Sequence, residues 1–192
     1  MSAPLPLRRV VAIGNFDGVH RGHQALVDHA VAVARALDAT ATALTFWPHP
    51  RRFLRPDHPP LLLTEPALRE TLLRQRGIAE VVTLPFDAAL AALPAERFVR
   101  DILIARLDTV HVVVGEDYRF GAGRAGDAAL LRQLGHELGF GVTAHRAVCD
   151  QAGRVCSSSR VRAALAGGDL DLAREILGCN SVIIGDRDGV PA

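Results

Sequence analysis

The segment Ile13–His23 places three glycines and two histidines between two stretches of different periodicity. Residues 9–13 are predicted to form a short buried strand, and residues 24–37 carry apolar side chains at helical spacing. The segment is therefore predicted to be a βα turn. Such a turn directs backbone N–H groups and the positive end of a helix dipole at a ligand above the sheet, and a phosphate is the natural occupant.

Length and composition favour one globular domain. The chain has 192 residues, of which 49% are hydrophobic and 22% charged, so it can bury a core. Its apolar runs are too short to span a membrane, and the first residues lack a signal-peptide pattern, so we expect a cytoplasmic protein with no membrane partner. The three cysteines form no C-x-x-C pair and are expected to be reduced.

The charged residues exclude several classes of chemistry. The sequence has 22 basic and 21 acidic residues, so no global field is available for a nucleic acid, and no nucleic-acid partner is expected. Every basic residue is Arg, and Lys is absent. This absence excludes a P-loop lysine, a Schiff base and a covalent lysyl-nucleotide intermediate.

The order of predicted elements indicates an α/β fold. Apolar runs typical of parallel strands occur at 9–13, 40–45, 81–84, 110–114 and 141–145, and helical patterns at 24–37, 66–76, 94–107 and 127–138. Strict alternation of this kind predicts a doubly wound, Rossmann-like parallel sheet in a single domain. Two short helices at 158–166 and 169–177 are predicted to form a small C-terminal helical segment, with the domain boundary near Gly178.

His20 and His23 lie three residues apart, a spacing that suits zinc, an exposed helix face or a phosphate. A catalytic zinc site needs a third protein ligand, and none occurs at matching spacing. The glycines directly before them favour a phosphate over two solvent-exposed histidines.

Residues 121–126 match the dinucleotide fingerprint G-x-G-x-x-G, but we reject that interpretation. Residues 115–120 separate these glycines from the preceding strand, and no acidic residue ends the next strand. The segment is predicted to be a flexible loop that carries Arg119 and Arg124 over the sheet edge. An ordinary surface loop is the alternative.

Two further segments have both a structural and a functional interpretation. The Ser157–Arg162 segment opens a helix with three hydroxyls followed by two arginines, which indicates either simple N-capping or a second anion site. Residues 46–53 combine aromatics, prolines and arginines, which suit stacking on a planar ring with a charged tail, or a flap over the core.

Four blocks of the sequence resemble, in the same order, the N-terminal module of the bacterial bifunctional riboflavin kinase/FMN adenylyltransferases, the FAD synthetases. The blocks are residues 14–23, 48–50, 115–121 and 157–162. The resemblance covers residues 9–178 and implies a sheet of the nucleotidylyltransferase type. Gly18 stands where related adenylyltransferases for other substrates usually have Pro. Tyr118 replaces a commoner Phe and Ser159 a commoner Thr, and both keep the ring or hydroxyl.

The resemblance implies transfer of AMP from ATP to FMN, which gives FAD and pyrophosphate by direct in-line displacement, with Mg²⁺ arriving with ATP. It assigns residues 1–178 to an FMN adenylyltransferase domain and 179–192 to a tail where a riboflavin kinase domain would otherwise begin. Riboflavin kinase activity is not expected, and a separate or truncated kinase domain is the suggested partner.

The resemblance also implies roles for individual residues. The expected catalytic residues are His20, His23, Ser158 and Arg162. The expected ATP-binding residues are these two histidines together with Gly14, Asn15, Phe16, Asp17, Gly22, Ser157, Ser159 and Arg160. The expected FMN-binding residues are Trp47, Pro48, His49, Pro50, Arg52, Phe53, Asp117, Tyr118, Arg119, Phe120 and Arg124. Asp17 is also the nearest candidate for a metal ligand.

Two other functions remain open from the sequence. A cytidylyltransferase of a small phosphorylated alcohol uses a similar phosphate loop, although such enzymes typically carry an R-T-x-G-x-S-T-T block where this chain has residues 157–162. A flavin- or nucleotide-binding module without turnover belongs to a different class.

Overall fold

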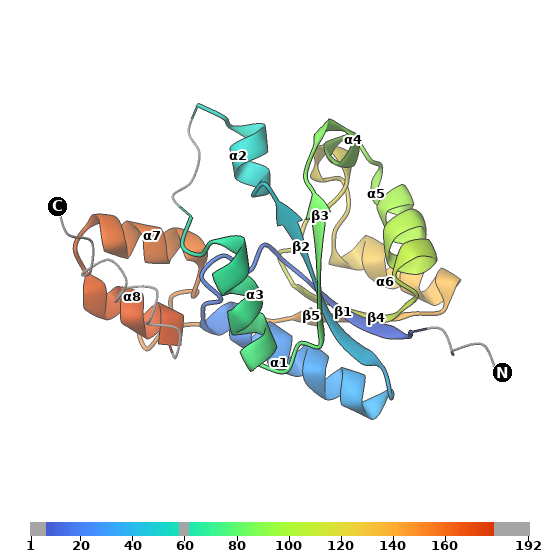
Figure 1. The fold of residues 1–192 in the computed structure, drawn as a ribbon, viewed down its shortest axis with the longest axis horizontal. Helices are drawn as coiled ribbons and strands as arrows, with labels where there is room; N and C mark the ends of the chain where they lie inside the picture. The colour runs from blue at the N-terminus through green and yellow to red at the C-terminus, as the bar shows by residue number, and fades with distance from the viewer. Residues whose placement is uncertain (1–6, 58–61, 179–192) are drawn as a thin grey trace.

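The computed structural model describes residues 7–57 and 62–178. These residues form a parallel sheet of five strands in the order β3-β2-β1-β4-β5 (Figure 1). The strands are β1 Arg9–Ile13, β2 Thr40–Trp47, β3 Glu80–Pro85, β4 Thr109–Gly115 and β5 Gly141–His145. This topology confirms the predicted doubly wound α/β sheet.

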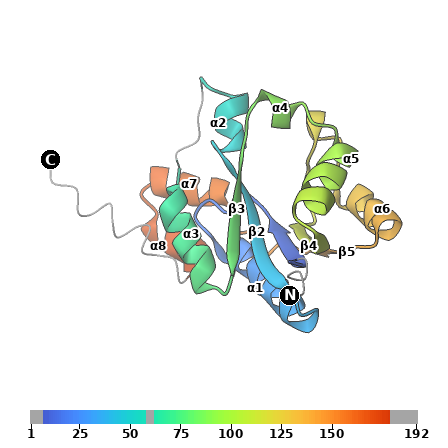
Figure 2. The ribbon, with the colours of Figure 1, turned by 45° about the vertical axis from the view of Figure 1, so that its right-hand side comes forward.

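Helices cover both faces of the sheet, as Figure 2 shows. They are α1 Arg21–Ala36, α2 Pro50–Leu54, α3 Pro66–Gln75, α4 Ala88–Ala91, α5 Ala95–Arg97, a π-helix η1 Phe98–Arg106, a 3-10 turn η2 Ala122–Arg124, α6 Ala128–Leu138, α7 Ser158–Ala166 and α8 Leu170–Leu177.

Alternation along the strands creates two separate cores. On β1, Val10 and Ala12 join a cluster with α1, α3, α7 and α8, whereas Val11 and Ile13 join a second cluster with η1 and α6. Successive side chains of a strand point to opposite faces, so a strand buried on both faces is apolar at every position. This explains why the central strands read as continuous apolar runs.

Most predicted elements occur within a few residues of their expected bounds. The first helix begins at Arg21 instead of residue 24, because Gly18 (φ 80°) and Val19 (φ 39°) complete the turn earlier and His20 is the N-cap. The helix predicted at 94–107 consists of α5 followed by η1.

The short helices α2 and α4 were not predicted. Pro50 opens α2, and the His49 ring accepts a hydrogen bond from the Arg51 N–H (3.1 Å). Asp87 caps α4 by accepting from the Leu90 N–H (2.8 Å). Each helix is stabilised by its cap and has too few residues to show a periodicity in the sequence.

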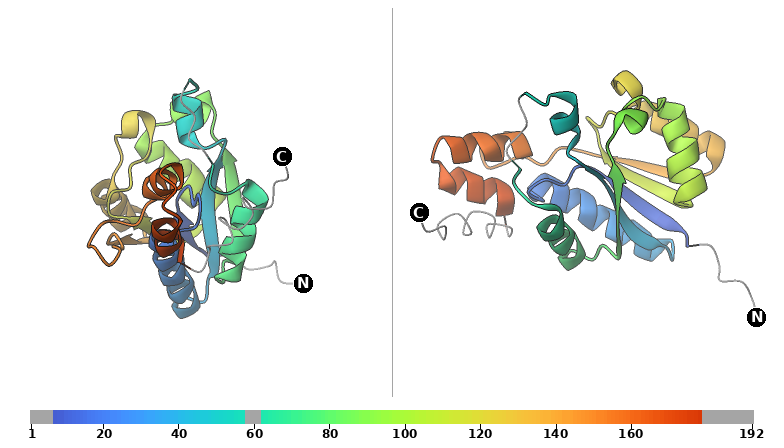
Figure 3. Two further views of the ribbon diagram at one scale, coloured as in Figure 1. Left: turned by 90° about the vertical axis from the view of Figure 1, so that its left-hand side faces the viewer. Right: turned by 45° about the horizontal axis from the view of Figure 1, so that its top comes forward.

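Helices α7 and α8 lie side by side near the start of α1 (Figure 3). The Gln24 side-chain amide joins them to α1 by donating to the backbone carbonyls of Val19 and Leu177, both at 2.8 Å. The predicted tail, residues 179–192, lies outside the described residues, as does Cys179. Across residues 7–57 and 62–178, no helix is long and apolar enough to cross a membrane.

The loop after β4 is tied to α5 through a glycine. Ala122 N–H donates to the Leu93 carbonyl (2.8 Å), and Gly121 packs so closely that a Cβ there would lie 2.6 Å from the Ala95 backbone. Gly121 also has φ 73°, where an L side chain is strained. Only glycine fits both constraints.

We therefore expect Gly121→Ala to lower the free energy of unfolding by about 3 kcal/mol or more, since backbone strain and overpacking add. Gly139→Ala is the matched control: Gly139 has a similar φ of 81° but open space around its Cα. That variant should lose only about 1 kcal/mol. Urea unfolding of both variants provides the comparison, and equal losses would contradict the packing argument.

Candidate active site

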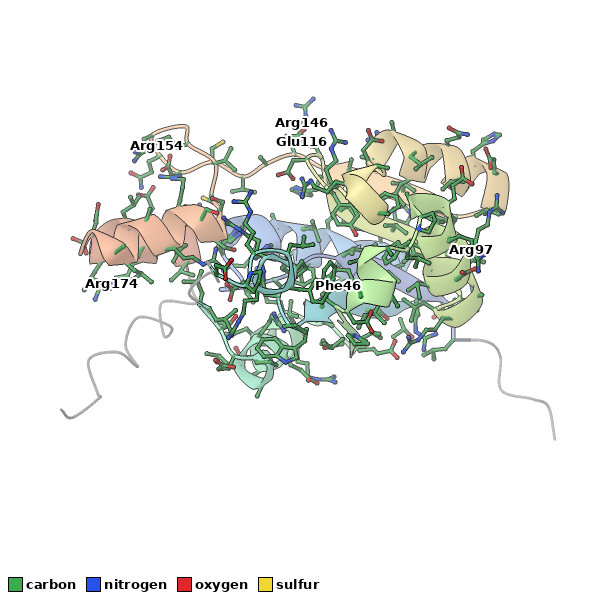
Figure 4. The ribbon with its side chains drawn as sticks, turned by 90° about the horizontal axis from the view of Figure 1, so that it is seen from above. Phe46, Arg97, Glu116, Arg146, Arg154 and Arg174 are labelled. Carbon is green, nitrogen blue, oxygen red and sulfur yellow. The ribbon has the colours of Figure 1, made fainter. Side chains whose placement is uncertain are left out.

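A cavity of about 740 Å³ opens at the carboxyl ends of the strands, as expected for an open parallel sheet. Its walls come from the segments after all five strands and from the first turns of α1 and α7. Figure 4 looks onto this end of the sheet, with Phe46 near the middle and Glu116 and Arg146 beside one another at the upper edge. Residues from position 13 to position 162 therefore meet in one site.

The segment 14–23, which is expected to bind phosphate and is called the phosphate loop, forms the βα turn after β1 and the first residues of α1. Phe16 is fully buried at φ 50°, a left-handed conformation that is uncommon for a large side chain. Its ring lies 3.1 Å from where a Cβ on Gly14 would be, and it meets the His23 ring edge-on with centroids 5.3 Å apart. Phe16 thus anchors the turn from below and does not line the cavity, whereas Gly14 and Asn15 do.

His20 and His23 form a stacked pair at the start of α1. Their ring centroids are 3.7 Å apart, and both rings line the cavity. Both Nδ1 atoms are buried, with no hydrogen-bond partner among the described residues. The alternative of two solvent-exposed histidines is therefore wrong.

Burial keeps both imidazoles neutral at pH 7. It lowers the pKa of His20 to about 4, and the nearby charge of Arg162 acts in the same direction. Burial also lowers the pKa of His23 well below its usual value, followed in size by the effects of His20 and Arg69. Neutral rings act as directed N–H donors and contribute no net charge to the site.

The Asp17 carboxylate lies beneath the phosphate loop, fully buried. One oxygen accepts hydrogen bonds from Leu63 N–H (3.0 Å), Thr64 N–H (2.9 Å) and the Thr64 hydroxyl (3.2 Å). The other oxygen forms a short ion pair with Arg162. Asp17 therefore joins the loop to the segment before α3 and to α7.

This environment does not fit the expectation that Asp17 binds a metal or ATP. Four donors occupy the lone pairs of its carboxylate, and the residue does not line the cavity. Over residues 7–57 and 62–178, no group of three or more His, Cys, Asp or Glu side chains is placed to hold a metal ion.

The segment that opens α7 supplies hydroxyls and one arginine to the cavity. Ser157 caps the helix by accepting from Arg160 N–H (3.3 Å), and the Ser158 hydroxyl donates to the Asp17 carbonyl (2.8 Å). Ser157, Ser158, Ser159 and Arg162 all line the cavity. The segment is therefore both an N-cap and a cavity wall.

Arg160 does not reach the cavity, contrary to its expected role in binding ATP. Its guanidinium pairs with the buried carboxylate of Asp150 (2.6 Å) and donates to the carbonyls of Arg154 and Val155. Two residues along a helix correspond to a rotation of about 200°, so Arg160 and Arg162 point to nearly opposite sides of α7.

The segment after β2 brings only some of its predicted flavin-binding residues to the cavity. His49 and Pro50 line the cavity, but Trp47, Pro48, Arg52 and Phe53 do not. Trp47 follows Phe46 on β2 and so points to the opposite face, while Phe46 lines the cavity. On α2 the helical rotation turns Arg51 and Leu54 to the cavity in place of residues 52 and 53.

The loop after β4 lies over the cavity as predicted. Asp117, Tyr118, Arg119, Phe120 and Arg124 all line it. The Tyr118 and Phe120 rings stack with centroids 5.5 Å apart, and Arg119 pairs with Asp127 at 2.9 Å. Burial raises the pKa of Tyr118, so its hydroxyl stays protonated at neutral pH. These residues give the cavity an aromatic wall with charges at its edge.

Sequence reasoning missed two groups of residues. Phe86 lies just after β3, and Phe98 and Val148 add to the apolar lining. Arg69 is 2% exposed on α3 and donates to the Asn15 carbonyl (3.1 Å). A basic residue next to Leu68, on a helix whose apolar face includes Leu72, was the available signal for Arg69.

Comparison with known proteins identifies several relatives. The chain is 42% identical over 171 residues to the bifunctional riboflavin kinase/FMN adenylyltransferase of Escherichia coli strain K12, and 40% identical over 169 residues to that of Pseudomonas fluorescens. Each alignment covers 88% of this chain and 54% of the relative. The chain therefore spans about half the length of these relatives.

A solved structure and a family model also match. The crystal structure described as a macrolide-efflux protein from Streptococcus pneumoniae superposes with a TM-score of 0.79 at 32% identity, covering 92% of this chain and 58% of that one. The model of the FAD synthetase family matches residues 4–159, which include the phosphate loop, the loop after β4 and the start of α7. The chain belongs to the FAD synthetase family.

Proposed function

We propose that this chain is an FMN adenylyltransferase, which transfers AMP from ATP to FMN and releases FAD and pyrophosphate. Family membership and the names of the relatives support this function. The observation that carries it is the cavity, which joins a phosphate loop at one side to an aromatic wall at the other. ATP and FMN need both features within one site.

The proposed reaction is a direct displacement at the α-phosphorus of ATP. An oxygen of the FMN phosphate forms the new P–O bond, and the bond from the α-phosphorus to the bridging oxygen breaks, so that pyrophosphate leaves. The nucleophile is already an anion and needs no general base. The absence of Lys agrees with a mechanism that has no covalent lysyl intermediate.

Alignment and electrostatic stabilisation would supply most of the rate enhancement. Correct alignment of two bound reactants can contribute about 7–11 kcal/mol. His20 and His23 would donate hydrogen bonds to the reacting phosphate, and each such bond to a charged group is worth about 1.5–3 kcal/mol. Because both rings are neutral, the positive charge would come from Arg162 and from the N-termini of α1 and α7.

Arg162 would hold the β- and γ-phosphates and the leaving pyrophosphate, together with Ser158 and Ser159. Its ion pair with Asp17 fixes the guanidinium before substrate arrives, and the residue lines the cavity in which the phosphates would bind. Mg²⁺ would arrive with ATP, and no step proposed here depends on a protein ligand to it. Asp17 is proposed as the residue that positions Arg162.

The flavin would lie between α2 and the loop after β4. Phe46 and Phe86 offer apolar rings at the base, and Tyr118 and Phe120 form the wall. Pro50, Arg51 and Leu54 would close the opposite side. Residues 1–178 are proposed as the adenylyltransferase unit, in line with the assignment from the sequence.

The direct test incubates the purified chain with ATP, MgCl₂ and FMN. We expect FAD, separated chromatographically and identified by its quenched fluorescence, with one pyrophosphate released per FAD. Binding of FMN and ATP without any FAD would contradict the proposed activity and favour a binding module. A matched reaction with CTP and a phosphorylated alcohol tests the cytidylyltransferase alternative.

His23→Ala should lower kcat by about 10²-fold or more, since removing one donor to the transition state costs about this much. The KM for FMN should stay within about twofold, because the lost contact strengthens mainly in the transition state. Steady-state kinetics measure both values. His136→Ala, an exposed histidine on α6, is the control and should keep wild-type rates. Near-normal turnover in His23→Ala would rule out the assigned role.

Arg162→Gln and Arg160→Gln form a matched pair that separates the two arginines of α7. Loss of Arg162 should raise the KM for ATP about tenfold or more, since a charge-assisted hydrogen bond to phosphate is worth about 1.5–3 kcal/mol. Arg160→Gln should leave the KM for ATP within about twofold, because its side chain faces Asp150. Equal effects in the two variants would contradict the geometry of α7.

A further inference from the structure

Arg69 is a buried cation that touches the phosphate loop from behind. Its side chain is 2% exposed, and Nη1 donates to the Asn15 backbone carbonyl at 3.1 Å. Its Nη2 is buried, with no hydrogen-bond acceptor among the described residues. In most buried guanidinium groups these donors are satisfied, so an unused one marks a functional candidate.

Acidic residues do not neutralise this charge locally. In the part of the chain that the structure describes, no carboxylate lies within 4.0 Å of the Arg69 guanidinium, whereas Arg162 forms an ion pair with Asp17. Asp17 and the exposed Glu65 act on Arg69 only at longer range. Asp17 is therefore paired with the partly exposed Arg162, and the buried guanidinium of Arg69 leaves an excess positive charge beneath the loop.

The excess charge lies close to the histidines of the site. Burial is the main cause of the lowered pKa values of His23 and His49, and the charge of Arg69 acts in the same direction on both; burial also lowers the pKa of Arg69 itself. His23 and His49 both line the cavity, and Arg69 does not. Its field therefore reaches the cavity through the loop and not through a direct contact.

We propose that Arg69 is a positioning residue for the phosphate site: it holds the Asn15 carbonyl and places a buried positive charge behind His23 that attracts the triphosphate. The inference rests on the proposed function, because it takes ATP as the anion. A buried charge without a close partner destabilises the free protein, and a bound anion compensates for it. Such a cost in stability is typical of binding sites.

A purely structural role of Arg69 would affect stability differently from a role in binding the anion. If the guanidinium served mainly to hold the loop, replacing it would lower the unfolding temperature and weaken every ligand. If it serves the triphosphate, an apolar replacement of similar length should leave stability equal or higher while weakening only ATP and tripolyphosphate. The two roles therefore predict opposite changes in the unfolding temperature when Arg69 is replaced by an apolar residue.

Three variants separate the hydrogen bond from the charge. Arg69→Gln keeps a donor for the Asn15 carbonyl and loses the charge, Arg69→Met loses both, and Arg69→Lys keeps both. Calorimetric titration with ATP and with inorganic tripolyphosphate, in the absence of FMN, should show about tenfold weaker binding in the Gln and Met variants. The Lys variant should recover binding to within about threefold of wild type, and FMN affinity should stay within about twofold in all three.

Arg132→Gln is the control for a general loss of positive charge, since Arg132 is exposed on α6 away from the cavity. It should bind tripolyphosphate as wild type does. The melting temperature of Arg69→Met should equal or exceed that of wild type. Unchanged ATP affinity in the folded Gln variant, or a fall in melting temperature with equal weakening of FMN and ATP, would overturn the inference.

These outcomes are separate from those of the proposed function. If wild type produces FAD but the Arg69 variants bind ATP normally, the adenylyltransferase proposal stands and the role of Arg69 is wrong. If wild type binds ATP without producing FAD, the activity proposal fails, and the differences in tripolyphosphate binding still test Arg69.

Discussion

The site depends on the buried carboxylate of Asp17. Its hydrogen bonds with Leu63 and Thr64 and its ion pair with Arg162 join three parts of the chain, the most distant of which lie 145 residues apart. Thr64 extends the contact by accepting from Gly18 N–H at 3.0 Å, and the Asp17 backbone accepts from Ser158 at 2.8 Å. A buried charge that loses its partner costs several kcal/mol, so these parts are held in one arrangement. That arrangement places the start of α7 opposite the start of α1.

In this site, different groups supply the positive charge and the oriented N–H groups. The stacked rings of His20 and His23 are neutral and offer N–H groups with a fixed orientation. The positive charge comes from guanidinium groups behind and beside them, with Arg162 lining the cavity and Arg69 beneath the loop. Guanidinium keeps its charge on burial far better than an ammonium, which suits a chain without Lys.

The sequence predicted what depends on local pattern. The strands, most helices and the βα turn after β1 follow from apolar runs, helical spacing and glycines, and these predictions of the fold were confirmed. The role of Asp17 did not follow, because its partners Thr64 and Arg162 are remote in sequence and nothing local marks them. Arg162 lines the cavity and Arg160 does not, and Leu54 lines it in place of Phe53. Which residue of each pair faces the cavity depends on the rotation of its helix, so the first residue of the helix must be known to within one position. The position of Arg69 beside the apolar face of its helix was a weak signal of burial, but its contact with Asn15 depends on how α3 packs against the loop.

The partners of Asp17 also set an order in which the site is completed when the chain is made from its N-terminus. The phosphate loop emerges from the ribosome first, its first donors follow about fifty residues later with Leu63 and Thr64, and Arg162 comes almost at the end of the fold. Until then the Asp17 carboxylate lacks its counterion and stays accessible to water. A nascent chain can therefore form most of its sheet before the proposed anion site is complete, and the proposed nucleotide would stabilise only the chain in which α7 has docked.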